Sequence, residues 1–269
     1  MSETTQPASD VEALLDIAIR ATRGAGELLK QRFLLGEELA ITSKSTPTDL
    51  VSEADLSAQR EIRALLSRER PDDGFLGEEQ GEDHQGNSGL RWVVDPLDGT
   101  INFLFGIPQW CVSVAVEDAE GPLAGAIFDP NRDELFTAVR NGPGRLNGGA
   151  PLEPSPRGEL PTAMVATGFA YDSTVRAAQA KVLERLIPQI RDVRRFGSAA
   201  LDLAWTAAGR YDAYFERSVK AWDIAAGTLI CRCAGLSILE LSPRPDLPWG
   251  ILAGPAGLAE QLHELVDRS

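Results

Sequence analysis

Hydrophobic residues in the first quarter of the chain recur every three to four positions. From Val11 to Leu29 they keep this spacing, which is typical of an amphipathic helix and predicts one over residues 9–33. The same spacing predicts a second helix over residues 52–69. A short apolar run at residues 74–77 then predicts a strand. The N-terminal part is therefore expected to begin with two long helices.

The spacing of hydrophobic residues changes to two between positions 110 and 140. Val112, Val114 and Val116 alternate with other residues, and two further apolar runs follow, each after a turn sequence. This pattern predicts strands that pair with their neighbours in sequence. We therefore expect an antiparallel meander here.

A proline-rich segment at residues 151–161 follows the meander. We expect the boundary between an N-terminal half, residues 1–150, and a C-terminal half, residues 151–269, to lie there. Beyond it, strand patterns at 164–169, 192–196, 211–216, 237–241 and 250–253 are interspersed with helix patterns at 174–186, 198–209, 221–234 and 256–266. Such alternation of strands and helices predicts an α/β arrangement for this half.

Composition and charge narrow the class of protein. Hydrophobic residues make up 43% of the chain and charged residues 25%, as in an ordinary globular protein. The net charge of −14 argues against a nucleic-acid backbone or an anionic membrane as the main partner. No apolar stretch approaches the roughly 20 residues that cross a bilayer, and the first residues lack signal-peptide features. We expect a cytoplasmic protein whose three cysteines are reduced.

Candidate chemistry gathers where an apolar run ends at Asp95. Pro96 follows it, and after Asp98 the chain turns through Gly99 into the apparent first turn of a helix at Thr100. The two carboxylates can face one small volume, and free N–H groups at a helix start suit an anion. Mg²⁺ typically binds to carboxylates together with the phosphate of a substrate. This combination of groups indicates metal-assisted attack on a phosphate ester. Taken alone, this short motif is equally compatible with a turn that carries two solvated aspartates.

The segment DPLDGTINF at residues 95–103 resembles the signature of the inositol monophosphatase family, lithium-sensitive phosphatases that depend on Mg²⁺. Two other segments, GEE at 77–79 and WDIAAG at 222–227, resemble further motifs of that family in the same chain order. The resemblance extends from about residue 10 nearly to the C-terminus. It implies a layered αβαβα sandwich, which is an α/β (α+β) fold, and usually a homodimer.

The resemblance also assigns roles to individual residues. It implies two to three Mg²⁺ ions, whose ligands would be Glu78, Asp95, the carbonyl oxygen of Leu97, Asp98 and Asp223. Thr100 and Glu78 would orient and deprotonate the attacking water, so the expected catalytic residues are Glu78, Thr100 and Asp98. Substrate contacts are expected from Lys44, Gly99, Thr100, Ser198, Ala199 and Glu216. Glu79 follows Glu78 directly, so in an extended chain its side chain would point away from that of Glu78 and would support the site without binding metal.

The substrate remains open among several phosphate esters. Inositol 1-phosphate is the first choice because Glu216 suits the hydroxyls of a polyol, and histidinol phosphate is the alternative because Glu216 could pair with its amine. Adenosine 3′,5′-bisphosphate and fructose 1,6-bisphosphate are less favoured, because no basic cluster fits a second phosphate. A regulatory binding protein is a further alternative, since some relatives associate with transcription machinery. No expected ligand carboxylate is missing, which favours an enzyme.

Overall fold

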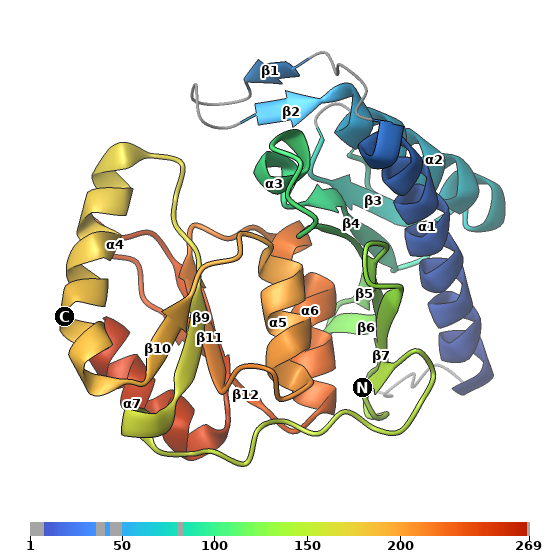
Figure 1. Cartoon of the computed structure of the whole chain (residues 1–269). Coiled ribbons are helices and arrows are strands. Elements are labelled where there is room, and N and C mark those ends of the chain that lie inside the picture. Colours follow the sequence, from blue (N-terminus) through green and yellow to red (C-terminus); the bar gives the residue numbers. More distant parts are fainter. Residues whose placement is uncertain (1–7, 36–40, 44–49, 80–82, 268–269) are drawn as a thin grey trace.

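The computed structural model describes residues 8–35, 41–43, 50–79 and 83–267. Its helices and two larger sheets form five layers, as Figure 1 shows. In layer order the helices are α1 (Ala8–Leu35) and α2 (Glu53–Glu69), then α5 (Ala199–Ala207) and α6 (Ala221–Cys233), then α4 (Ser173–Leu186) and α7 (Ala256–Asp267). Each pair of helix layers encloses one sheet. The layered αβαβα sandwich expected from the sequence is therefore confirmed.

The first sheet has six strands in chain order. They are β3 (Gly74–Gly77), β4 (Arg91–Asp98), β5 (Cys111–Asp118), β6 (Gly121–Asp129), β7 (Glu134–Val139) and β8 (Arg145–Leu146). Only β3 and β4 pair in parallel, and β4 to β8 pair antiparallel. This confirms the predicted meander.

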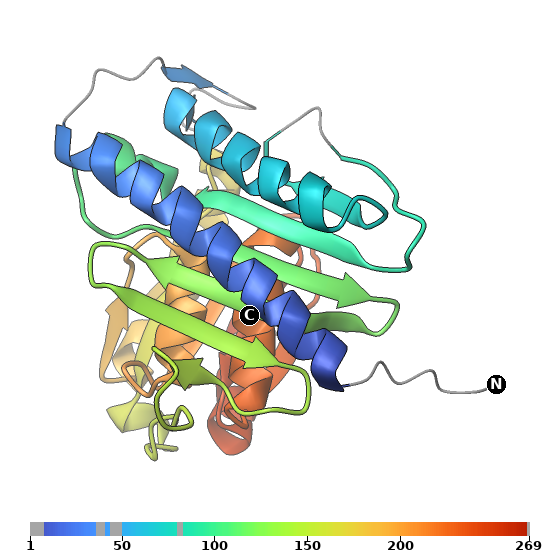
Figure 2. The ribbon, with the colours of Figure 1, turned by 90° about the vertical axis from the view of Figure 1, so that its right-hand side faces the viewer.

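The alternation in β5 follows from burial on both faces of this sheet. Val112, Val114 and Val116 pack in the core beneath α1 and α2, which lie across the sheet in Figure 2. Cys111 and Ala115 point the other way, into the core around α5 and α6. The middle helices therefore pack against the first sheet and, through the same core, against the second.

The second sheet has five strands, in the order β10 (Asp192–Arg194), β9 (Met164–Thr167), β11 (Ala213–Arg217), β13 (Gly250–Gly254) and β12 (Ser237–Leu241). β9 pairs in parallel with both β10 and β11, whereas β13 is antiparallel to β11 and β12. α4 and α7 cover its outer face through a separate core. The predicted elements of the C-terminal half are all present, and the division at residue 150 stays a prediction.

One strand differs from its prediction in a way that matters for the site. β4 does not stop at Asp95 but continues to Asp98, with a shift in its pairing to β5 between these two residues. Asp95 lies opposite Ser113 and Asp98 opposite Cys111, so β4 contains one extra residue, as in a β-bulge. Pro96 explains the irregularity because it has no N–H to donate to the ladder. The bulge holds both aspartates at the strand end.

The remaining elements are short. They are the hairpin strands β1 (Ile41–Ser43) and β2 (Leu50–Ser52), the helix α3 (Thr100–Leu104) and the 3₁₀ turns η1 (Leu160–Thr162) and η2 (Ile187–Gln189). The hairpin was not predicted. Among the described residues, no helix combines the length and the apolar character that a membrane span requires.

Candidate active site

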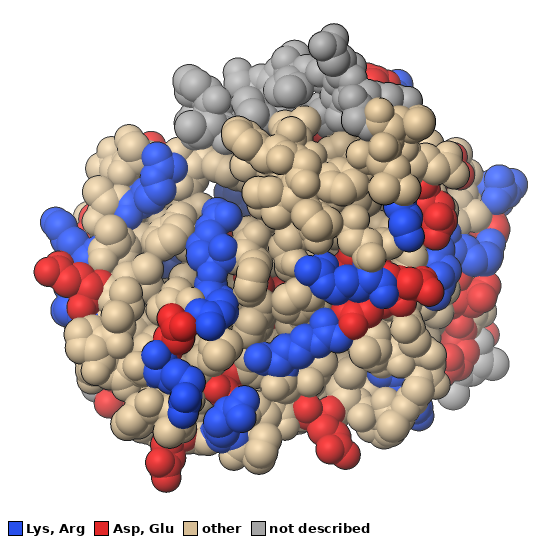
Figure 3. All heavy atoms as spheres, in the orientation of Figure 1, with Lys and Arg blue, Asp and Glu red and all other residues tan. Residues whose placement is uncertain are grey.

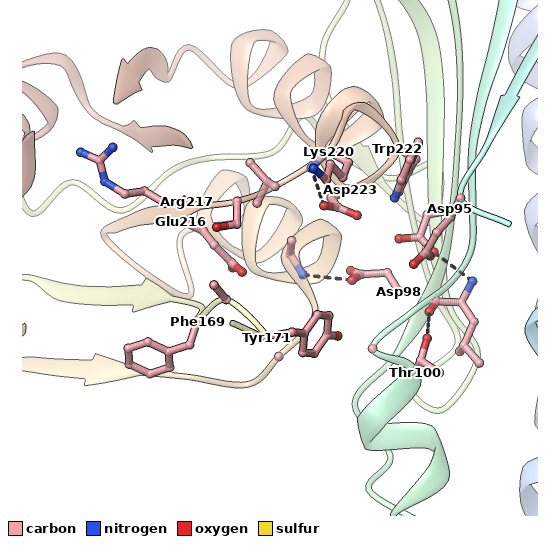
Figure 4. A pocket seen from close by; sticks show the side chains of 18 of the residues that line it. Asp95, Asp98, Thr100, Phe169, Tyr171, Glu216, Arg217, Lys220, Trp222 and Asp223 are labelled. Carbon is pink, nitrogen blue, oxygen red and sulfur yellow. Dashed lines mark hydrogen bonds between the residues drawn. The ribbon is translucent and has the colours of Figure 1, made fainter. Parts of the chain in front are cut away.

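A cavity of about 480 Å³ lies where the end of β4 meets the starts of α5 and α6. Its walls include Glu78, Asp95, Leu97, Asp98, Gly99, Thr100, Ala199, Glu216 and Asp223, all of which were predicted as site residues. Figure 4 shows Asp95, Asp98 and Asp223 directed toward the same space. Lys44, also predicted, lies outside the described residues. Residues from both halves of the chain therefore meet around one hollow.

Strand and helix ends bring the four carboxylates together. Asp95 and Asp98 lie at the two ends of the β4 bulge, Glu78 follows β3, and Asp223 lies in the first turn of α6. Asp95 is 1% exposed and Asp98 8%. Burial, followed by the charges of Glu78, Asp98 and Asp223, holds the pKa of Asp95 well above its usual range. Glu78 and Asp223 are half-buried, so two buried and two half-buried carboxylates face one another and call for a cation or for protons.

The donor set fits Mg²⁺ better than an ion that needs a closed cage of side chains. Within the described ranges, no three His, Cys, Asp or Glu side chains stand in the arrangement of a preformed metal cluster. Mg²⁺ usually keeps several waters and takes only one or two carboxylates together with substrate phosphate oxygens. One or two of the carboxylates of Asp95, Asp98 and Asp223, which line the cavity together with Leu97, suit such a hydrated ion.

The start of α5 holds Asp98. Its carboxylate accepts hydrogen bonds from Ser198 Oγ at 2.6 Å, from the Ala200 amide at 2.7 Å and from the Ala199 amide at 3.2 Å. Burial raises the pKa of Asp98 to about 6, and these hydrogen bonds oppose the rise. Ser198 is 1% exposed, so its hydroxyl faces Asp98. The substrate contacts expected from Ser198 and Ala199 stay predictions, and the observed role of both is to fix Asp98.

Thr100 has a carboxylate partner that the sequence analysis missed. Its Oγ1 lies 2.8 Å from Asp55 Oδ1 and 3.1 Å from the carbonyl oxygen of Leu97, so its single proton can go to either. Asp55 is fully buried in the first turn of α2. Asp55 and Gln59 are polar residues at core-facing positions of an amphipathic helix. Because polar side chains are rarely buried without a role, these positions could have indicated from the sequence that both residues belong near the site. Gln59 bonds both backbone groups of Glu79 and so fixes the end of β3.

Gly99 is required by the tight path between β4 and α3. Its φ of +98° lies in the left-handed region, and a Cβ there would lie 2.9 Å from the carbonyl oxygen of Gln109. The chain can therefore turn directly from Asp98 into the helix that begins with Thr100. This places the amides of Gly99 and Thr100 next to the carboxylates.

Glu216 lies on β11 at the far wall of the cavity from Thr100, as Figure 4 shows. Its Oε2 accepts a hydrogen bond from the Tyr214 hydroxyl at 3.0 Å. Its carboxylate occupies the space that a Cβ at Gly168 would need. Burial raises the pKa of Glu216 to about 7, against the opposing charge of Arg195. The hydroxyl of Tyr214 therefore fixes the carboxylate of Glu216, which lies apart from the aspartates.

The surface charge does not surround the cavity with a uniform acidic field. Figure 3 shows Lys and Arg side chains across the middle of the face seen in Figure 1, with acidic side chains beside them. This face therefore has basic as well as acidic side chains, although the net charge of the whole chain is −14. An anionic substrate would not meet a continuous barrier of like charge on this face.

Buried carboxylates predict how stability depends on pH. The pKa values of Asp98 and Glu216 rise from 3.8 and 4.5 to about 6 and about 7, so the folded protein holds these protons more tightly than the unfolded chain. Their contribution is fully present below pH 4 and is lost as pH rises through 6 and 7. Without divalent metal, we expect the thermal midpoint at pH 5.5 to exceed that at pH 8 by on the order of 5 °C.

Thermal melts of the metal-free protein across this pH range test the expectation. Saturating Mg²⁺ is expected to flatten the profile, because bound cations favour the ionised carboxylates. A midpoint that falls on acidification from pH 8 to 5.5 would contradict it.

Comparison with known proteins identifies the family of the chain. The model of the inositol monophosphatase family matches residues 10–269. The chain is 45% identical to Nus factor SuhB of Xylella fastidiosa, over 95% of this chain and 94% of that protein. It is 41% identical to inositol-1-monophosphatase of Rhizobium meliloti, over 95% and 97%.

A solved structure agrees with the sequence comparisons. The extragenic suppressor protein suhB from Bartonella henselae superposes with a TM-score of 0.88 at 35% identity, covering 96% of this chain and 99% of that one. The resemblance drawn from three short motifs is thus confirmed over nearly the whole length. This chain belongs to the inositol monophosphatase family.

Proposed function

We propose that the protein is a Mg²⁺-dependent phosphomonoesterase that hydrolyses inositol 1-phosphate to inositol and phosphate. The observation that carries the proposal is the meeting of Glu78, Asp95, Asp98 and Asp223 around one cavity. These residues and the carbonyl of Leu97 would hold two to three Mg²⁺ ions. Such ions lower the pKa of a bound water and neutralise phosphate charge.

The side chains of this protein supply the positioning and the proton path. A water that donates to Thr100 Oγ1 can pass its proton on when Thr100 in turn donates to Asp55 Oδ1, which lies 2.8 Å away. Asp98, fixed by the start of α5, keeps the ligand set in place. The amides of Gly99 and Thr100 would bind phosphate oxygens. Glu78 follows β3 beside Asp95 and would act as a ligand and as a further proton acceptor.

The leaving group would occupy the end of the cavity lined by Glu216. A carboxylate held by Tyr214 is a good acceptor for the hydroxyls of a polyol, which supports inositol 1-phosphate. Histidinol phosphate is the alternative, because its amine could also pair with Glu216. The inositol-1-monophosphatase of Rhizobium meliloti, at 41% identity, agrees with the first choice.

A second candidate is a non-catalytic binding role. It is favoured by the 45% identical relative that is named a Nus factor. Against it, the chain keeps every carboxylate that the metal-dependent reaction would use. The cytoplasmic location expected from the sequence, and the homodimer and the sensitivity to lithium implied by the resemblance, stay predictions.

Hydrolysis of a panel of esters tests the proposed function. The panel contains inositol 1-phosphate, histidinol phosphate, adenosine 3′,5′-bisphosphate and fructose 1,6-bisphosphate, each with Mg²⁺, with Mg²⁺ and Li⁺, and with a chelator. We expect the highest kcat/KM for inositol 1-phosphate, inhibition by Li⁺ and no turnover with the chelator. A clear preference for histidinol phosphate would change the substrate, and no turnover of any ester would support the binding role.

A further inference from the structure

Three basic residues line the cavity among the described residues, namely Arg195, Arg217 and Lys220. Arg217 is 3% exposed, and its guanidinium bonds the carbonyls of Ser242 and Pro248 and the carboxylate of Asp267. Figure 4 shows it directed away from the aspartates. Lys220 directly precedes α6 and donates its backbone N–H to Asp223. Of the three, Arg195 is the residue whose positive charge acts on Glu216, where it lowers the pKa of the carboxyl.

Two glycines make room for the charged groups of Arg195 and Glu216. The guanidinium of Arg195 folds over Gly197 and occupies the space where a side chain would begin, and Glu216 does the same at Gly168. Gly197 has a φ of +82°, so the chain turns sharply there just before α5. Arg195 also opposes the rise in the pKa of Glu216, as expected for a positive charge near that carboxylate. The cavity wall thus offers an acceptor and a donor.

Glu216 by itself would not distinguish a polyol from an amino alcohol. An ionised carboxylate binds an ammonium more strongly than a hydroxyl, because both partners of the hydrogen bond are then charged. A guanidinium near the same carboxylate cancels its net charge and adds donors for the lone pairs of hydroxyl oxygens. Hydroxyl groups both donate and accept, so this pair of side chains is complementary to a neutral polyol.

We propose that Arg195 is the specificity-determining residue of the site, donating to hydroxyl oxygens of the leaving group and repelling a leaving group that carries an ammonium. The inference rests on the proposed phosphatase activity and deepens it. It assigns the choice between inositol 1-phosphate and histidinol phosphate to one exposed side chain. Such a choice is a difference of two transition-state energies, so it is read from a ratio of kcat/KM values.

Arg195→Gln tests the proposal, with kcat/KM measured for both esters at saturating Mg²⁺. We expect the ratio of inositol 1-phosphate to histidinol phosphate to fall at least tenfold, since hydrogen bonds to charged groups contribute about tenfold to a hundredfold. Arg195→Lys keeps the positive charge and is expected to retain most of the preference. Because Arg195 is exposed, both variants are expected to melt like the wild type.

Arg194→Gln is the matched control. Arg194 is the preceding residue, pairs with Asp192 at 2.6 Å and does not line the cavity, so its variant is expected to keep the wild-type ratio. An unchanged ratio in Arg195→Gln, with both esters still hydrolysed, would overturn the role of Arg195 and leave the proposed function intact. If the wild type hydrolyses neither ester, the proposed function fails, and the inference fails with it.

Discussion

Asp98→Asn is expected to lower kcat/KM for inositol 1-phosphate by about 10³-fold, because a metal ion at a transferring phosphate contributes several kcal/mol of charge stabilisation. The amide has one oxygen in place of two, and in either orientation its NH₂ group would face a backbone N–H donor, that of Ala199 or that of Ala200. The variant therefore loses a ligand and its fixed orientation. Steady-state kinetics over a range of Mg²⁺ concentrations measure the effect.

The fold is expected to survive this substitution. Burial raises the pKa of Asp98 to about 6, so at neutral pH the metal-free protein carries a largely ionised and poorly solvated carboxylate there. Replacing it with a neutral amide removes the unfavourable free energy of burying a charge, and this gain offsets the weakened hydrogen bonds. Circular dichroism and a thermal melt check this point.

Asp133→Asn is the control for Asp98→Asn. Its side chain is 78% exposed and its φ is +54°, a conformation that asparagine also adopts readily. We expect wild-type kinetics from this variant. Mg²⁺-dependent hydrolysis at the wild-type rate by folded Asp98→Asn would contradict the role of Asp98 as a metal ligand.

The sequence predicted those parts of the site that are local in the chain. Asp95, Asp98, Gly99 and Thr100 lie within six positions, so one proline turn and one glycine could indicate their convergence. The continuation of β4 to Asp98 was missed because a bulge preserves strand pairing beyond Pro96, and proline normally ends a strand. The sequence therefore predicted that these residues converge, but it did not predict that β4 stays paired with β5 beyond Pro96.

Contacts between distant segments could not be predicted in the same way. Asp55 and Thr100 are 45 residues apart, and their hydrogen bond depends on how α2 packs beside β4. Ser198 and Asp98 are 100 residues apart, so the family motif located Ser198 but not its partner. Helical periodicity predicts which face of α2 is buried. It does not predict which polar group on another element a buried side chain will meet.

The hydrogen bond between Thr100 and Asp55 gives the second large prediction. Thr100→Val removes the hydroxyl that would accept the water proton and is expected to lower kcat by about 10²- to 10⁴-fold with little change in KM. Thr100→Ser keeps the hydroxyl and is expected to restore most of the rate. Rates for both variants with inositol 1-phosphate at saturating Mg²⁺ measure this.

Thr206→Val separates a catalytic role of a hydroxyl from a structural one. Thr206 is also buried, and its hydroxyl donates to the carbonyl of Asp202 in its own helix at 2.7 Å. Its loss is expected to cost about 1 kcal/mol of stability, as is typical of one hydrogen bond, and to leave kcat unchanged. A drop in kcat similar to that of Thr100→Val would point to general loosening of the fold.

The combination with Asp55→Asn decides whether the two side chains act as one unit. If the proton passes from water through Thr100 to Asp55, either single change interrupts the same path. The double variant should then be no slower than the slower single variant, because groups that act together are strongly non-additive. Independent roles would instead multiply the two losses. A multiplicative result, or a wild-type kcat in Thr100→Val, would exclude the relay and leave Asp55 as a residue that only orients Thr100.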